Sequence, residues 1–190
     1  NSVYEKFNLA EQMDIIVNEI IKGKVVGLMQ GRMEFGPRSL GSRSIIADPR
    51  SPNMQKKLNL KIKFRESFRP FAPSVLREDL NDWFEMNFDS PYMLLVAEVK
   101  KEKQLKMSNE DENLFGIEKL NIKRSNIPAI THVDYSARIQ TVHKNTNPKY
   151  FDLLYNSYKK RISPVEQTNK MFQGEKSLGD QMNKLQLPLM

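Results

Sequence analysis

The sequence predicts a single α+β domain with a mixed β-sheet flanked by helices. Two segments, Leu9–Ile21 and the stretch that begins at Pro148, repeat apolar residues at helical spacing. Between them, short apolar runs such as Val25–Met29 and Tyr92–Val99 are bounded by glycine, proline and polar residues, which is typical of strands. Helices and strands do not alternate strictly, and this favours an α+β domain over a doubly wound fold.

The first quarter of the chain predicts a helix and two strands. Leu9–Ile21 is the helix, with Asn8 and Glu11 as a capping box and Gly23 as its end. The elements expected next are a strand, a loop rich in glycine and arginine, and a second strand: Val25–Met29, Gln30–Arg43 and Ser44–Ala47.

The middle of the chain continues with mixed elements. Pro52 suits the first turn of a helix over Ser51–Phe64. The elements expected after it are a strand, a short helix and a strong strand: Ala72–Leu76, Glu78–Phe84 and Tyr92–Val99. Lys100–Asn126 is polar without clear periodicity, so we expect a mobile excursion or a hairpin tip there.

The last elements are two strands and a helix. Ala129–Thr131 and Ala137–Val142 should flank a turn at Asp134. Strand alternation would place Arg138 and Gln140 on the face opposite Ala137 and Ile139. Asn147 should cap the helix that begins at Pro148, with Phe151, Leu154, Tyr158 and Ile162 on one face. From residue 163 the pattern dissolves, so we divide the chain into a domain at 1–162 and a divergent tail at 163–190.

Composition excludes several function classes. The chain has no cysteine, which rules out thiol catalysis, disulfides and cysteine-ligated metals. Two histidines, His132 and His143, are too few for a histidine-rich metal site. No apolar run approaches a membrane span and no signal-peptide pattern is visible, so we expect no membrane partner and a cytoplasmic location.

The net charge of +7 fits a nucleic acid, an anionic membrane surface or a small anionic substrate. Lysine runs such as Lys159–Arg161 are typical of solvated faces. The arginines between Arg32 and Arg69 differ, because they lie among glycine, proline, phenylalanine and serine with little acidic compensation. This distribution indicates a site for a compact anion.

The segment Gly31–Arg43 is the first candidate for that site. Its glycines allow close approach of the backbone to a ligand, and Arg38 offers a planar fork for phosphate oxygens. No Gly-Lys-Ser/Thr closes the segment, so it is not a Walker A loop. A structural turn whose arginines pair with Glu34 and Asp48 is an equally good interpretation.

Two further segments carry candidate residues. In Lys61–Phe71 cations alternate with aromatic residues, and we expect Phe64, Phe68 and Phe71 inside with Lys63 and Arg69 at a pocket. Nucleic-acid binders also interleave arginine and phenylalanine, so that alternative stays open. In Thr131–Val142, His132 could act as a general acid or base, although a lone histidine is more often structural.

These segments together resemble the C-terminal domain of the carbamoyltransferase family that includes the nodulation-factor and antibiotic O-carbamoyltransferases. The matching stretches are GRMEFGPRSLGSRSIIADPR, LNLKIKFRESFRPFAPSVL, SPYMLLVAEV, PAITHVDYSARIQTV and NPKYFDLL, in the order of the family. They run from about Gly27 to Leu154, which is most of the chain.

The resemblance implies a twisted mixed sheet with a basic cleft, similar to the threonylcarbamoyl-adenylate synthases (YrdC-like). It implies that carbamoyl phosphate and ATP give carbamoyl-adenylate with loss of pyrophosphate, before the carbamoyl group passes to a hydroxyl acceptor. The basic residues of the family's pocket fall on Arg38, Lys63, Arg69 and Arg138, as catalytic and substrate-binding residues, with Ser39 and His132 as further substrate-binding residues. The implied cofactors are ATP and Mg²⁺.

The sequence departs from the family pattern in two respects. Family members carry an N-terminal actin-like domain that supplies the acceptor site and a metal, so we expect such a domain as a partner of this chain. The family closes its pocket with Leu-Asn-Thr-Ser-Phe-Asn after Pro-Val, whereas Glu166–Phe172 follows Pro164-Val165 here. The changed closing motif leaves a non-catalytic remnant of the transferase open as an alternative to a transferase domain. The expected basic cleft leaves a basic RNA-binding module open as another.

Overall fold

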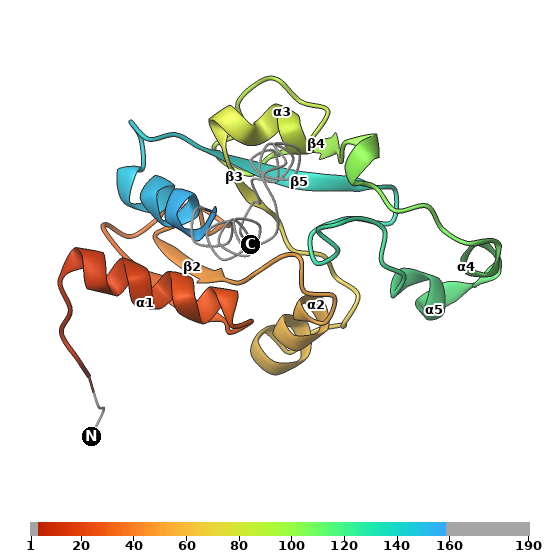
Figure 1. Cartoon of the computed structure of the whole chain (residues 1–190), viewed down its shortest axis with the longest axis horizontal. Coiled ribbons are helices and arrows are strands. Elements are labelled where there is room, and N and C mark those ends of the chain that lie inside the picture. Colours follow the sequence, from red (N-terminus) through yellow and green to blue (C-terminus); the bar gives the residue numbers. More distant parts are fainter. Residues whose placement is uncertain (1–3, 159–190) are drawn as a thin grey trace, which may run out of the picture.

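A computed structural model describes residues 4–158 of the chain (Figure 1). The predicted tail at 163–190, and its boundary with the domain, lie outside the described residues. The α+β class is confirmed, but two small sheets replace the one mixed sheet that we expected. Within residues 4–158, no helix has the length and apolar character needed to cross a membrane.

The N-terminal helix and hairpin form as the sequence predicts. α1 (Leu9–Ile21) has its capping box, in which the Asn8 side chain accepts from the Glu11 amide at 2.9 Å and the Glu11 carboxylate accepts from the Asn8 amide at 3.1 Å. β1 (Val26–Met29) pairs antiparallel with β2 (Arg43–Ile46), and Met29 lies opposite Arg43. The hairpin therefore holds both ends of the loop formed by residues 30–42.

The next helix changes geometry along its length. α2 (Met54–Leu58) continues directly as the π-helix η1 (Asn59–Lys63), which ends at Phe64 in the left-handed conformation (φ 49°, ψ 51°). The expectation that Phe64 and Phe68 lie inside was wrong, since they are 84% and 37% exposed. The helix has already ended at Phe64. The chain returns to the core only at Phe71, whose side chain packs against the core cluster.

The second sheet is built around one long strand. β5 (Ser136–Val142) pairs in parallel with β3 (Ser74–Leu76) and antiparallel with β4 (Leu95–Glu98), so the order is β3-β5-β4 (Figure 1). The predicted alternation is confirmed: Ala137 and Ile139 are fully buried in the core, on the face opposite Arg138.

Two predicted strands need correction. Residues 128–130 form a turn, in which the Ala129 amide donates to the Pro49 carbonyl and the Ala129 carbonyl accepts from the Phe71 amide, instead of joining a sheet. The predicted strand Tyr92–Val99 shrinks to β4, because Met93 is left-handed (φ 56°) and interrupts the extended backbone.

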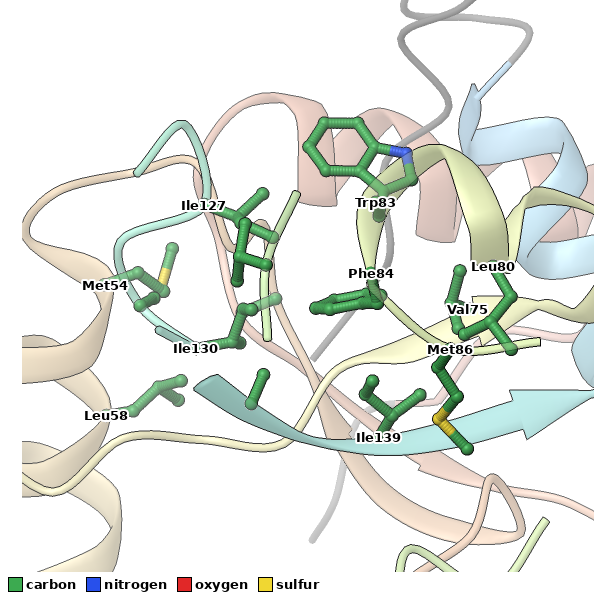
Figure 2. Close-up of a cluster of buried hydrophobic side chains, with 14 residues drawn as sticks. Met54, Leu58, Val75, Leu80, Trp83, Phe84, Met86, Ile127, Ile130 and Ile139 are labelled. Atoms are coloured by element: carbon green, nitrogen blue, oxygen red, sulfur yellow. The ribbon is translucent and has the colours of Figure 1, made fainter. Parts of the chain in front are cut away.

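The main hydrophobic core lies between this sheet and the helices beside it (Figure 2). The 3₁₀-helix η2 (Arg77–Asp79) and α3 (Leu80–Trp83) make up the predicted helix in this region. Leu80, Trp83 and Phe84 are fully buried here, together with Ile127 and Ile130.

The polar excursion of residues 100–126 contains short helices, which the sequence did not predict. They are the 3₁₀-helix η3 (Lys101–Lys103), α4 (Asn109–Asn113) and α5 (Gly116–Leu120). Ser108 and Asp111 form a capping box that starts α4. Arg124, only 5% exposed, donates to the carbonyl groups at the end of α5, which explains this buried charge structurally.

Residues 148–158 are helical, as predicted from the Asn147 cap, whose side chain accepts from the Tyr150 amide at 3.3 Å. Phe151, Leu154 and Tyr158 on its apolar face are buried. Together with α1 and the first hairpin, this helix forms a second hydrophobic cluster. That cluster fixes the helix directly behind the loop of residues 30–42.

Candidate functional site

The loop of residues 30–42, the end of η1 and strand β5 meet around a cavity of about 310 Å³, which we call the cationic pocket. Its described lining contains no acidic side chain. The basic side chains that line it are Arg38, Lys63, Arg65 and Arg138. Ser39 and Ser44 contribute hydroxyl groups to the same lining, whereas the hydroxyl groups of Ser74 and Tyr150, which also line it, donate to other protein groups. The pocket therefore combines concentrated positive charge with hydrogen-bond donors, which suits a compact anion.

The loop of residues 30–42 is organised from inside by a carboxylate. Glu34 accepts hydrogen bonds from the amides of Leu40, Ser42 and Arg43 at 2.8, 2.9 and 3.1 Å. The Arg43 guanidinium donates to the Gln30 carbonyl oxygen at 2.8 Å. Glu34 thus folds the loop through its backbone, and Arg38 forms no ion pair with a carboxylate within residues 4–158.

The structural-turn alternative predicted that Glu34 and Asp48 pair with the arginine side chains of residues 31–43, and the structure shows other partners for both carboxylates. Glu34 binds backbone amides, as described above, and Asp48 pairs with Arg50, at 2.7 Å between Oδ2 and Nη2. The Arg38 Nε atom is buried and has no hydrogen-bond partner among the described residues. A buried donor without a partner costs about 1–3 kcal/mol, and an anion in the pocket would supply the missing acceptor.

Arg138 enters the pocket from β5 because strand alternation turns it away from the core. Its Nε atom is also buried without a partner among residues 4–158, and its Nη2 donates to the Met93 sulfur at 3.9 Å. Burial, and then the positive charges of Arg38 and Arg65, lower the pKa of Arg138. The pocket cations therefore repel one another, and an anion would relieve that repulsion.

Arg65 is the pocket residue that sequence reasoning missed. Its Nε donates to the Asn59 side-chain oxygen at 2.6 Å, and its guanidinium carbon lies 4.9 Å from the centre of the Phe71 ring. Burial, and then the charge of Arg69, lower the pKa of Arg65. Lys63 and Arg65 flank the exposed Phe64, and this two-residue spacing was the available signal.

Arg69, which was predicted in the pocket, is not part of its lining. Its Nε lies 2.8 Å from the Glu66 carboxylate, and its side chain is 54% exposed. The adjoining Pro70 does line the pocket, so Arg69 lies at the rim with its guanidinium directed to a surface ion pair. Such exposed pairs contribute about 0–1 kcal/mol and are readily exchanged for another partner.

His132 lies in a neighbouring cavity of about 410 Å³ that shares Pro70 with the cationic pocket. Its Nδ1 is 2.9 Å from the Ser136 hydroxyl, which donates to Asp134 at 2.7 Å. Burial lowers the pKa of His132, Asp134 opposes this, and Arg138 adds to it. Of the predicted site residues, Arg38, Ser39, Lys63 and Arg138 share one pocket, while Arg69 lies at its rim and His132 lines the neighbouring cavity.

The described residues include no metal centre. Within residues 4–158, no group of three or more histidine or acidic side chains is arranged to hold a metal ion.

A model of the carbamoyltransferase C-terminus matches residues 17–171 of the chain. An uncharacterized protein of Synechocystis sp. is 60% identical over 153 residues, which cover 80% of this chain and 25% of that protein. Nodulation protein NolO of Bradyrhizobium diazoefficiens is 44% identical over 74% of this chain and 22% of its own length. The 3′-hydroxymethylcephem-O-carbamoyltransferase of Streptomyces clavuligerus is 39% identical over 70% of this chain and 21% of its own length. The chain thus spans a quarter or less of these relatives.

Proposed function

We propose, from the premise that this chain belongs to the carbamoyltransferase C-terminal family, that its cationic pocket binds the phosphate of carbamoyl phosphate. The observation that carries the proposal is the convergence of Arg38, Lys63, Arg65 and Arg138 on one small cavity whose described lining lacks acidic side chains. A phosphate dianion matches this charge and offers several acceptor oxygens to the two unpartnered Nε donors.

The proposed role of these cations is electrostatic. Arginine forks hold phosphate oxygens in a fixed orientation, and donors fixed in advance stabilise charge that develops as the carbamoyl group leaves its phosphate. Within the proposal, water first cleaves carbamoyl phosphate to carbamate and inorganic phosphate. A carbamate oxygen then attacks the α-phosphorus of ATP, which forms carbamoyl-adenylate and releases pyrophosphate. The neighbouring cavity around His132 is the proposed location for the rest of the nucleotide, since the two cavities share Pro70.

The complete reaction is proposed for a longer assembly. A named relative of known activity transfers a carbamoyl group to a hydroxymethyl cephem, and the present chain corresponds to about a fifth of it. We propose that an actin-like N-terminal partner supplies the acceptor site and Mg²⁺, and that residues 1–162 act as the carbamoyl-phosphate domain with a fold like the threonylcarbamoyl-adenylate synthases. The chain alone should therefore bind carbamoyl phosphate and transfer nothing to an acceptor.

Titration calorimetry of the 190-residue chain with carbamoyl phosphate tests the proposal. Saturable binding should be lost in Lys63→Met and retained in Lys61→Met, which removes the same charge from the same π-helix outside the pocket lining. An excess of RNA should not compete, which separates this function from a basic RNA-binding module. The absence of saturable binding, or equal binding by the two variants, would refute the proposed function.

A further inference from the structure

A chain of buried hydrogen bonds runs beneath the loop that carries Arg38. The Tyr150 hydroxyl donates to the Ser74 hydroxyl, which donates to the Gln140 side-chain oxygen, and the Gln140 amide nitrogen donates to the Leu40 carbonyl. Each of these three bonds is 2.8 Å long. Tyr150, Ser74 and Gln140 are only 1%, 2% and 4% exposed, so water does not compete for these groups.

The Leu40 carbonyl at the end of the chain fixes the direction of every hydrogen bond before it. A carbonyl oxygen cannot donate, so Gln140 must present its NH₂ group to Leu40 and its oxygen to Ser74. Ser74 must then donate to Gln140, which leaves a Ser74 lone pair free to accept from Tyr150. Burial raises the pKa of Tyr150 to about 12, although its bond to Ser74 opposes this, so the phenol keeps the proton that it donates.

The same tyrosine supports the loop through its ring. Gly41 has φ +112°, a conformation that other residues rarely adopt, and a Cβ atom there would lie 2.4 Å from the Tyr150 ring. Direct contact of backbone and ring leaves no room for the loop to move closer to the helix of residues 148–158. Tyr150 therefore limits the position of the loop in one direction, and the hydrogen bond to Leu40 limits it in the other.

The peptide groups of Leu40 are thus held from two sides. Glu34 accepts from the Leu40 amide at 2.8 Å, and Gln140 donates to the Leu40 carbonyl at 2.8 Å. Arg38 lies two residues before this doubly held position, and its own buried Nε has no partner within residues 4–158. The position of the Arg38 guanidinium therefore depends on the backbone that carries it, rather than on contacts of its own Nε.

We infer that Gln140 and Tyr150 are positioning residues of the cationic pocket, which hold the Arg38 segment at the distance needed for anion binding. Neither residue has to touch the anion for this role. The inference rests on the proposed function for the identity of the ligand, carbamoyl phosphate. The mechanical link from Tyr150 through Ser74 and Gln140 to Leu40 is independent of the proposed function.

A double-mutant cycle tests the link through ligand affinity. Gln140→Leu should weaken carbamoyl phosphate binding about tenfold and Tyr150→Phe about threefold, since each removes hydrogen bonding from the chain. Because both act through Leu40, the double variant should bind about as weakly as Gln140→Leu alone. Tyr155→Phe removes the same hydroxyl from the same helix outside the chain of bonds, and it should leave affinity unchanged. Additive losses in the double variant, or unchanged affinity in Gln140→Leu, would overturn the inference.

Amide hydrogen exchange of the ligand-free chain provides the readout that does not need a ligand. Gln140→Leu and the milder Tyr150→Phe should accelerate exchange at residues 38–43, while α1 and the Tyr155→Phe control stay unchanged. Uniform acceleration over the whole chain would indicate a merely structural role and refute the inference. If the wild-type chain fails to bind carbamoyl phosphate, the proposed function is refuted, and exchange at residues 38–43 still decides whether this segment is positioned by Gln140 and Tyr150.

Discussion

Arg138→Met should stabilise the ligand-free chain while it abolishes anion binding. The Arg138 Nε atom is buried without a partner among residues 4–158, and the guanidinium faces the positive charges of Arg38 and Arg65. An unsatisfied buried donor costs about 1–3 kcal/mol. Methionine keeps most of the unbranched stem and removes both the donor and the charge, so a gain of roughly 1 kcal/mol is expected.

The effect is large enough to measure by thermal unfolding. A gain of 1 kcal/mol corresponds to an increase in Tm of about 2–4 °C for a chain of this size. For the wild type, carbamoyl phosphate at one hundred times its Kd should contribute about 2.7 kcal/mol, or roughly 5–11 °C in Tm. Arg138→Met should therefore melt higher than the wild type without ligand and show no increase with it.

The control for this experiment is an arginine whose charge is compensated. Arg50 pairs with Asp48 at 2.7 Å outside the cationic pocket. Arg50→Met should lower Tm, because it removes the ion pair of a carboxylate that is only 9% exposed, and it should retain the full ligand-induced increase. The reasoning is refuted if Arg138→Met melts below the wild type and still shows the ligand-induced increase.

Three further predictions concern the pocket rim, the loop and a buried acid. Arg65→Ala should lower both the affinity for carbamoyl phosphate and the Tm. Arg69→Ala should lower the affinity but shift Tm by less than about 1 °C, because its ion pair is half exposed. Calorimetry and melting curves of both variants test this, and an equal loss of stability in the two would contradict it. Gly41→Ala should lower Tm by several degrees, since it adds backbone strain of about 1–3 kcal/mol and a clash with the Tyr150 ring, and an unchanged melting curve would exclude the described loop position. Burial, and then the two neighbouring acidic side chains, raise the pKa of Asp79 to about 7. The folded state then holds a proton that the unfolded state has released, so stability falls as pH rises from about 4 to 7. Asp79→Asn should remove this pH-dependent loss of stability, so the variant should gain more in urea midpoint over the wild type at pH 8 than at pH 5. Equal gains at the two pH values would contradict a raised pKa of Asp79.

Local sequence patterns predicted the starts of two helices and the two faces of β5. Asn8 and Glu11 predicted the start of α1, and Asn147 predicted the helix of residues 148–158, because capping involves residues only three positions apart. Alternation along β5 predicted that Arg138 faces away from the core. The predicted strand at 129–131 failed, because its apolar residues are buried by contacts with distant loops and not by sheet pairing.

The sequence by itself also predicted that the site would be rich in basic side chains. Arginine and lysine among glycine and proline, with little acidic compensation, indicated a compact anion, and the family motifs located Arg38, Lys63 and Arg138. The two-residue spacing of Lys63 and Arg65 was a local signal for the remaining arginine, but only the tertiary structure decided that Arg65 and not Arg69 lines the pocket. Arg65 does so because η1 ends at a left-handed Phe64, whereas Arg69 turns to Glu66. That backbone reversal has no local sequence signal.

Only the tertiary structure could reveal how the loop is held. The bonds of Gln140 to Leu40, Gln140 to Ser74 and Tyr150 to Ser74 join residues that are 100, 66 and 76 positions apart. No helical or strand period relates such residues, and each side chain by itself predicts no more than a buried polar group. Their partnership arises when β3 pairs with β5 and the last helix packs behind the loop, because those contacts bring the donors and acceptors within hydrogen-bond distance.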